Sequence, residues 1–355
     1  MKWLKRIALS LGGVLALAAG LIGFCALSYW NDMRIDESRG INEAGYVRIG
    51  GIDQWVQIRG DDRNNPVLLY LNGGPGFTTI GATYWYRSWE KRYTVVMWDQ
   101  RGEGKSFDRS GPSVKGTMTL AQLTQDGAEL AEYLTRRLHK RKIILLGHSW
   151  GSALGVHIAQ ARPDLFSAYV GTGQLANEQQ NAQVSYPLLL ERARLRKHRQ
   201  AEQELVAAGP PPYSEDVRQW IPLEVWAEVL DPAQEGATPL SAGSIWWRLK
   251  NLVRRDEIAP GITPAVAFSM STLWPDLVKD DLPSLGMQFQ VPVVFIQGTE
   301  DITTVTALAK DYFDRIAAPS KRFVTLDGVG HLAIFTDREG FLRALDEHVR
   351  PLADL

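Results

Sequence analysis

Hydrophobic residues along the chain fall into short, regularly spaced runs. Two early segments, 45–49 and 54–58, alternate between apolar and polar residues around the turn at Gly50-Gly51, which predicts a β-hairpin. Six later runs are apolar at nearly every position, as in strands that helices cover on both faces. These runs span residues 67–71, 94–98, 143–146, 168–171, 293–297 and 322–326.

Between these runs the apolar residues recur with a helical period. Such segments lie at 120–138, 152–161, 305–316 and 338–348. Strands that alternate with helices are typical of an α/β fold with a mostly parallel sheet. We therefore predict an α/β core made of residues 45–173 and 286–355, with helices on both faces of the central sheet.

The alternation stops between residues 174 and 285, where charged, helix-like segments surround the prolines 210–212 and no convincing strand is visible. We interpret this stretch as a helical cap inserted into the core. A basic run at 192–199 is expected to form a solvated face of a cap helix. The tryptophans of the cap either line an apolar pocket or pack its helices together: Trp220, Trp226, Trp246, Trp247 and Trp274.

The amino-terminal segment differs from the rest. Lys2, Lys5 and Arg6 precede an uncharged apolar stretch at 7–30, which is long enough to span a bilayer. We predict a membrane anchor at residues 1–30 and a linker at 31–44. The basic residues favour a cytoplasmic amino terminus, with the remainder of the chain outside the cytoplasm. The alternative is a secreted protein whose signal peptide is cleaved after residues 26–28, although the apolar stretch exceeds the usual signal length.

Composition narrows the possible functions. The 355 residues are 45% hydrophobic and 22% charged, as in globular proteins, and the net charge of −1 provides no field that attracts nucleic acid. The single cysteine, Cys25, and six scattered histidines give no metal-ligand spacing. We expect neither a metal nor a cofactor.

Residues 147–151, Gly-His-Ser-Trp-Gly, fit the pattern G-x-S-x-G between an apolar strand and a helix start rich in small residues. In that context the serine occupies a tight turn, and the glycines leave room beside it. The amino terminus of the following helix favours developing negative charge. Ser149 is therefore a candidate nucleophile, although a serine hydroxyl needs a general base to remove its proton.

An acid and a base should follow the serine in that order along the chain. The run at 293–297 leads into a turn with Glu300 and Asp301, and the last run leads into a loop that holds His331. Both loops follow strands, and active sites of α/β sheets form at the carboxyl ends of strands. His331 is the candidate base, and either carboxylate is a candidate acid.

A glycine-rich loop at 72–76, Asn-Gly-Gly-Pro-Gly, follows the first buried run. Lipases and esterases carry an oxyanion-binding loop at this position. The backbone N–H groups of Gly74 and Trp150 are the candidate donors, because such donors must be fixed toward the charge that forms.

Three motifs together resemble the proline iminopeptidase-like family of α/β-hydrolases, over roughly residues 45–350. The H-G-G-P-G motif of that family corresponds to 72–76, its D-Q-R-G-x-G-x-S motif to 99–106, and its G-G-S-W-G-S motif to 147–152. The resemblance implies an aminopeptidase with a Ser149–His331–Asp301 triad, since the family places its aspartate three residues after the glycine that ends the strand. It also implies that the D-Q-R-G run shapes a loop beside the site.

Two residues depart from the family pattern, because Asn72 replaces a histidine and His148 replaces a glycine. The resemblance further implies that glutamates of the cap hold the free amino group of a peptide, but no motif selects among Glu178, Glu191, Glu224 and Glu228. We expect a serine hydrolase that acts on short peptides. The alternatives are an esterase or other hydrolase of small acyl substrates, and a non-catalytic, membrane-tethered binding protein.

Overall fold

The computed structural model describes residues 2–231 and 263–353. Their centre is one eight-stranded sheet in the order β1-β2-β4-β3-β5-β6-β7-β8. The hairpin strands β1 and β2 are antiparallel, β2 is antiparallel to β4, and the other neighbours are parallel. The strands are β1 (Ile41–Ile49), β2 (Ile52–Gly60), β3 (Val67–Leu71), β4 (Thr94–Asp99), β5 (Ile143–His148), β6 (Phe166–Thr172), β7 (Val293–Gly298) and β8 (Lys321–Leu326).

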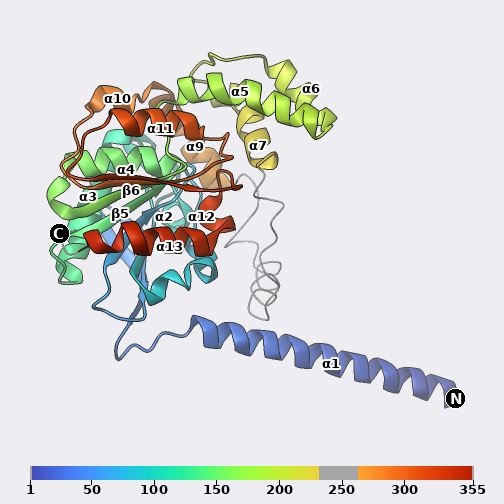
Figure 1. The fold of residues 1–355 in the computed structure, drawn as a ribbon. Coiled ribbons are helices and arrows are strands. Elements are labelled where there is room, and N and C mark those ends of the chain that lie inside the picture. The colour runs from blue at the N-terminus through green and yellow to red at the C-terminus, as the bar shows by residue number, and fades with distance from the viewer. Residues whose placement is uncertain (1, 232–262, 354–355) are drawn as a thin grey trace.

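Helices cover both faces of this sheet because successive strand residues point to opposite sides. Leu69 and Leu145 join the apolar cluster under α3 (Leu120–Arg137), α4 (Trp150–Ala161) and α11 (Thr306–Arg315). Their neighbours Leu68 and Leu146 join a second cluster on the other face. That face is covered by α12 (Ala333–Thr336), α13 (Arg338–His348), η1 (Ile80–Tyr86) and η2 (Trp89–Lys91), and Figure 1 shows α4 and α13 on opposite sides of the strands.

Each apolar run forms a strand, and the predicted helix at 338–348 has the bounds of α13. Two features differ from the sequence-based expectations. Strand β1 begins at Ile41, inside the predicted linker, because Ile41 and Asn42 pair with Gly60 and Arg59 of β2. The last strand, β8, is the edge of the sheet, and most of its residues are exposed or half-buried rather than covered on both faces.

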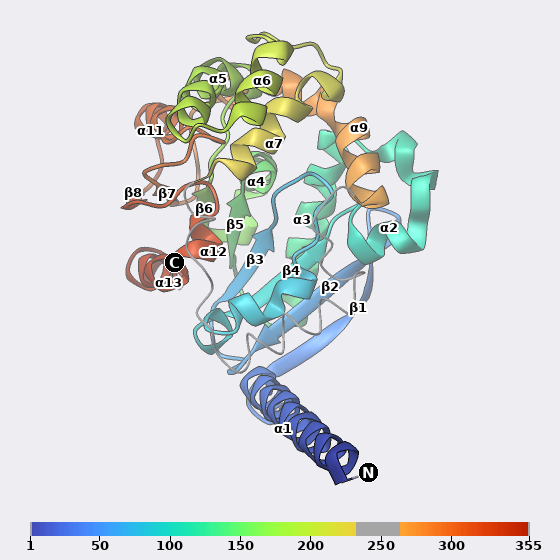
Figure 2. The same cartoon turned by 90° about the vertical axis from the view of Figure 1, so that its right-hand side faces the viewer.

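The cap helices of the described residues lie between β6 and β7 and extend over the carboxyl ends of the central strands (Figure 2). They are α5 (Glu178–Leu195), α6 (Arg199–Ala208), α7 (Ile221–Val229), α9 (Pro264–Lys279) and α10 (Leu282–Leu285). Trp220, Trp226 and Trp274 are buried, and the rings of Trp220 and Trp274 lie 5.5 Å apart. These three tryptophans pack the cap, whereas Trp246 and Trp247 lie outside the described residues.

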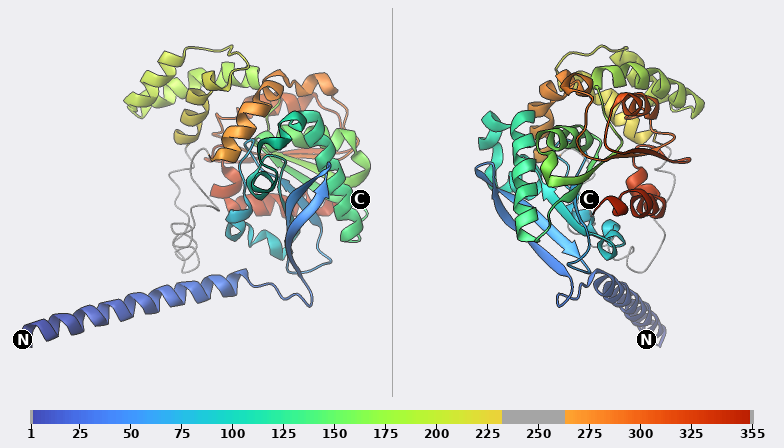
Figure 3. Two further views of the ribbon diagram at one scale, coloured as in Figure 1. Left: turned by 180° about the vertical axis from the view of Figure 1, so that it is seen from behind. Right: turned by 60° about the vertical axis from the view of Figure 1, so that its left-hand side comes forward.

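Helix α1 (Lys2–Met33) projects away from the sheet, with most of its apolar side chains exposed (Figures 1 and 3). Its segment Ser10–Met33 is long and apolar enough to cross a membrane, a property that signal sequences share. The carboxyl end is attached to the core, since Arg59 donates to the carbonyl of Met33 at 2.9 Å. Arg87 donates to the carbonyls of Asp32 and Arg34.

Candidate active site

Ser149 lies on the turn between β5 and α4, with φ 55° and ψ −124°. This left-handed conformation is unusual for a residue with a side chain and marks stored backbone strain. The N–H of Ser149 donates to the carbonyl of Thr172 on β6 at 3.0 Å, which fixes the turn to the sheet.

Both glycines of the turn are required by close backbone contacts. A Cβ atom at Gly147 would lie 2.2 Å from the carbonyl oxygen of Gly151. A Cβ atom at Gly151 would lie 2.3 Å from the carbonyl oxygen of Leu71. The G-x-S-x-G spacing is therefore a steric condition of this fold, because any side chain at these two positions would displace the backbone.

Asp301 and His331 meet at the carboxyl edge of the sheet, in the loops after β7 and β8. The ring Nδ1–H of His331 donates to Asp301 Oδ2 at 3.0 Å. The other carboxylate oxygen, Oδ1, accepts the backbone N–H groups of Thr303 at 3.0 Å and Thr304 at 2.9 Å. Both side chains are buried, so the pair is held in a single orientation.

Thr304 also belongs to this arrangement, although no sequence motif points to it. Its hydroxyl donates to Asp301 Oδ2 at 2.9 Å and lies 3.0 Å from His331 Nδ1. The sequence feature that could have indicated it is a hydroxyl residue three positions after Asp301, in the same turn. Glu300, the other candidate acid, is exposed and instead forms an ion pair with Arg192 of α5 at 3.3 Å.

The candidate nucleophile Ser149 and the candidate base His331 lie close to each other in the fold. The ring of His331 is centred 4.8 Å from that of His148, the residue before Ser149. In the described part of the chain, the Ser149 hydroxyl has no hydrogen-bond partner, so the structure joins Asp301 and His331 directly but not Ser149 and His331. In hydrolases without substrate the bond from the nucleophile to the base is often long and tightens when substrate binds.

Surrounding carboxylates favour the protonated form of His331. Burial alone lowers its pKa, but the charge of Asp301 and its hydrogen bond, together with the charges of Asp231 and Glu224, outweigh burial. The pKa of His331 is therefore raised above its usual value near 6.5.

The glycine-rich loop lies beside Ser149. A Cβ atom at Gly73 would lie 3.2 Å from the Cβ atom of Ser149, and Gly74 has a φ of +137° that a side chain would strain. Trp150 follows Ser149 directly and begins α4, and its indole N–H donates to Gln100 Oε1 at 3.3 Å. The two predicted oxyanion donors thus belong to segments that flank Ser149.

Glu103, the variable position of the D-Q-R-G-x-G motif, fastens this loop to the motif. Its Oε2 accepts from the side chain of Asn72 at 3.2 Å and from the N–H of Gln100 at 3.0 Å. Its Oε1 accepts the N–H of Gly76 at 3.2 Å. Burial raises the pKa of Glu103 well above the usual range. Asn72 thus links the glycine-rich loop to Glu103 at the position where the resembled family has histidine.

Arg101 of the same motif bonds to two other segments of the core. It forms a buried ion pair with Asp126 of α3 at 2.8 Å, and its Nη2 donates to the carbonyl of Gly50 in the hairpin at 2.7 Å. The motif therefore connects the hairpin, α3 and the glycine-rich loop. Its observed contacts are structural, and none of them involves Ser149, Asp301 or His331.

Two of the four cap glutamates are shielded from solvent. Glu178 of α5 is buried and Glu224 of α7 is half-buried, whereas Glu191 and Glu228 are exposed. Burial raises the pKa of Glu178 well above the usual range, and the charge of Glu224 adds to the effect. Burial also raises the pKa of Glu224 to about 7, although the neighbouring charge of His331 opposes this increase.

Metal-ligating side chains do not gather at this site. Within residues 2–231 and 263–353 no group of three or more His, Cys, Asp or Glu side chains is arranged to hold a metal ion. The functional groups that the described residues bring to this edge of the sheet are a hydroxyl, an imidazole, carboxylates and backbone N–H groups.

Comparison with known proteins identifies the class. A family model described as "Alpha/beta hydrolase family" matches residues 68–344, and the chain belongs to that family. A probable aminopeptidase, YbaC, of Bacillus subtilis (strain 168) is 28% identical over 320 residues, which cover 89% of this chain and 99% of the relative. A probable proline iminopeptidase of Streptomyces coelicolor is 26% identical, covering 86% and 95%.

Solved structures agree on the fold. The proline iminopeptidase-related protein of Thermus thermophilus superimposes with a TM-score of 0.60 at 21% identity, covering 88% of this chain and 99% of that one. A thermophilic esterase of Thermogutta terrifontis superimposes with a TM-score of 0.55 at 16% identity, covering 89% and 99%. The shared fold therefore extends to proteins whose names indicate different reactions.

The geometry separates the two candidate acids. Asp301→Asn should lower kcat by about 10³- to 10⁴-fold, because an amide neither holds the His331 tautomer nor stabilises its positive charge. Glu300→Gln should change kcat less than about threefold, because the Glu300 side chain is exposed and, among the contacts described, bonds only to Arg192. Steady-state kinetics on both purified variants, with thermal unfolding to verify folding, would show the reverse order if Glu300 were the acid.

Proposed function

We propose that this protein is a serine hydrolase of the proline iminopeptidase type, which removes an amino-terminal residue from short peptides. The observation that carries the proposal is the buried Asp301–His331 pair at 3.0 Å, on the sheet edge where Ser149 occupies a strained turn. This combination of strained serine, imidazole and buried carboxylate is the usual arrangement for acyl transfer.

The proposed reaction has two steps. His331 removes the proton of Ser149 as its oxygen attacks the scissile carbonyl, and the N–H groups of Gly74 and Trp150 hold the resulting oxyanion. His331 then gives the proton to the leaving amine, and the acyl group remains on Ser149. Water, activated by the same imidazole, hydrolyses this acyl-enzyme, while Asp301 stabilises the imidazolium in both steps.

Glu178 and Glu224 are the proposed recognition site for the free amino group. Both lie on cap helices. Besides burial, the charge of Glu224 raises the pKa of Glu178, and the same charge helps to raise the pKa of His331. Two carboxylates that repel each other in a buried site gain from binding an ammonium group between them. The names of the bacterial relatives, aminopeptidase and proline iminopeptidase, support the same substrate class.

A fluorophosphonate probe tests whether Ser149 is a nucleophile. The wild-type chain should be labelled, and Ser149→Ala should lose labelling completely while its thermal unfolding temperature stays within a few degrees. Absence of labelling in the folded wild type would favour the non-catalytic binding protein. Wild-type enzyme that has not been treated with the probe is then assayed on proline naphthylamide and p-nitrophenyl butyrate, since turnover of the ester alone would favour an esterase.

The cap carboxylates are tested by charge removal. Glu178→Gln and Glu224→Gln should each raise KM for an unblocked peptide by about 10- to 100-fold, the equivalent of ~1.5–3 kcal/mol for a charge-assisted contact. Turnover of an ester without an amino group should be nearly unchanged. Glu191→Gln, on the exposed face of α5, is the control. Equal losses on blocked and unblocked substrates would contradict the assignment.

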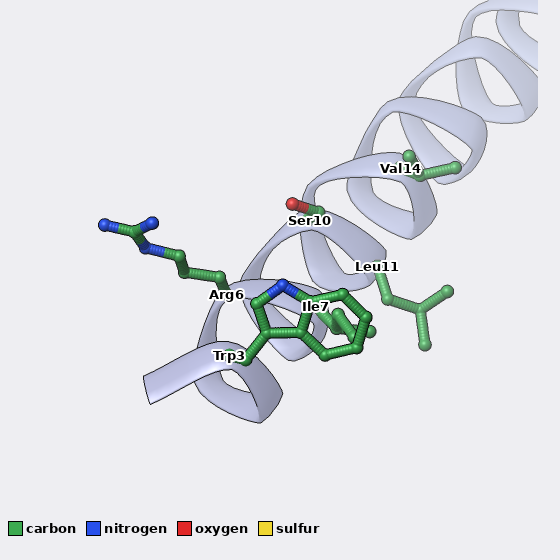
Figure 4. A pocket seen from close by; sticks show the side chains of 6 residues that line it. All are labelled: Trp3, Arg6, Ile7, Ser10, Leu11 and Val14. Carbon is green, nitrogen blue, oxygen red and sulfur yellow. The ribbon is translucent and has the colours of Figure 1, made fainter. Parts of the chain in front are cut away.

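We further propose that α1 is retained as a membrane anchor, with the amino terminus in the cytoplasm. The possible cleavage segment 26–28 lies within the continuous helix α1, whose carboxyl end is held by Arg59 and Arg87. The ring of Tyr29 also lies 5.6 Å from that of Tyr84. At the opposite end Trp3, Ile7, Leu11 and Val14 extend outward from the helix (Figure 4), as side chains in contact with lipid do.

If α1 is retained as an anchor, the location of the protein in the cell can be predicted. The test uses the protein expressed with its own amino terminus and a carboxyl-terminal tag. The chain should remain in the membrane fraction after carbonate washing, with the mass of the full sequence. Externally added protease should reach the hydrolase domain in spheroplasts. A soluble product that begins near Tyr29 would instead identify a signal peptide.

A further inference from the structure

One face of cap helix α5 is bonded to the loop that carries Asp301. Asn181 and Ser185 are four residues apart and lie on the same face of the helix. The Asn181 amide donates to the carbonyl of Thr303 at 2.5 Å, and its oxygen accepts the N–H of Val305 at 2.9 Å. The Ser185 hydroxyl donates to the carbonyl of Ile302. Asn181 and Ser185 are both buried, so these bonds are shielded from water.

Arg192 extends the same contact. It lies seven residues beyond Ser185, again on that face, and its guanidinium reaches Glu300 at 3.3 Å and the carbonyl of Leu230 at 3.3 Å. The expectation that the whole basic run is solvated is therefore wrong for Arg192. This side chain bridges the loop of the acid and the end of cap helix α7.

Asp231, which follows α7, contacts the loop of the base. Its Oδ2 accepts the backbone N–H of His331 at 2.6 Å, and the residue is only 1% exposed. A Cβ atom at Gly330 would lie 2.3 Å from the same oxygen, so the chain must carry glycine before His331 to approach this carboxylate. Asp231 thus bonds to the main chain of the residue whose ring performs the proposed proton transfer.

We infer that Asp231 is a positioning residue, through which the cap holds the backbone of His331 in place for the proposed acyl transfer. The inference rests on the proposed function for its catalytic consequence, but the contact itself does not depend on it. Together with Asn181 on the acid loop, it makes the cap a structural part of the triad. The two loops of the Asp301–His331 pair are then both fastened to the cap.

A carboxylate is suited to this role for two reasons. A charge-assisted hydrogen bond is roughly twice as strong as a neutral one, so the loop is held firmly. Second, the charge of Asp231 helps to raise the pKa of the His331 ring. The titratable groups around His331 are Asp301 from the acid loop, Asp231 and Glu224 from the cap, and His148 from β5, whose pKa is lowered to about 3 by burial and then by the charge of His331.

The test compares Asp231→Ala, Asp231→Asn and the control Asp280→Asn. Asp280 is a largely buried cap carboxylate that bonds to His157 at 3.0 Å, away from the triad. Asp231→Ala should slow fluorophosphonate labelling by about 100-fold at every pH, because a small displacement of the base has effects of that order. Asp231→Asn keeps an acceptor and should slow labelling by less than about tenfold, since the weaker neutral bond still holds the loop. Asp280→Asn should label at the wild-type rate.

A second measurement does not depend on activity. The titration of His331, followed by NMR in histidine-labelled protein, should move to lower pH in Asp231→Asn and should not move in Asp280→Asn. A merely structural contact would leave this titration where it is in the wild type. Asp231→Asn also serves if Asp231→Ala does not fold, since its side chain has the same shape.

The outcomes separate the two proposals. Unlabelled wild-type protein would overturn the serine hydrolase, while the shift in the His331 titration would still support or reject the role of Asp231. Normal labelling of folded Asp231→Ala, or an unchanged titration in Asp231→Asn, would overturn the positioning role even if the hydrolase is confirmed.

Discussion

The turn at Ser149 is the constraint on which the rest of the site depends. A non-glycine residue with a positive φ costs about 1–3 kcal/mol and persists only where its surroundings enforce it. Here the buried strand β5 leads into the turn, the Ser149 N–H is bonded to β6, and the backbone of Gly151 lies against the carbonyl of Leu71. The same contacts that enforce the strain also place Ser149 beside the glycine-rich loop, where a Cβ atom at Gly73 would lie 3.2 Å from the Cβ atom of Ser149.

A second constraint is that several carboxylates are buried. The structure accommodates them in two ways. Asp301 is buried, but its oxygens accept hydrogen bonds from two backbone N–H groups, a hydroxyl and an imidazole. Glu103 and Glu178, by contrast, are buried without an ion pair among the described contacts, and the pKa of each is raised well above the usual range. Glu103 accepts from three N–H groups and so joins two loops, whereas Glu178 and Glu224 form the proposed site for the ammonium group of the substrate.

The sequence allowed the strands, the core helices and the residues of the proposed triad to be predicted, because their signals are local. Apolar runs identify strands, and glycine spacing identifies the turn at Ser149. Thr304, Asp231 and the selection of Glu178 and Glu224 were not predictable in this way. Asp231 and His331 are 100 residues apart in sequence, so only the folded cap brings them together. Arg192 was wrongly grouped with its solvated neighbours because a run of basic residues does not show which member faces the protein.

The two departures from the family motifs are connected in space. The resembled family has histidine at the start of the glycine-rich loop and glycine before the nucleophile, whereas this chain has Asn72 and His148. The ring of His148 lies close to Gly73, where a Cβ atom would be 3.2 Å from Nδ1, and its Nε2 lies 3.1 Å from the carbonyl oxygen of His331. Burial keeps this ring neutral, so Nε2–H can donate to that carbonyl while Nδ1 faces the loop. An imidazole is thus present at the same edge of the sheet but is supplied by β5 instead of the loop. Asn72, next to Gly73, donates to Glu103 at 3.2 Å, so both departures from the family motifs contribute to the contacts that hold the glycine-rich loop beside Ser149.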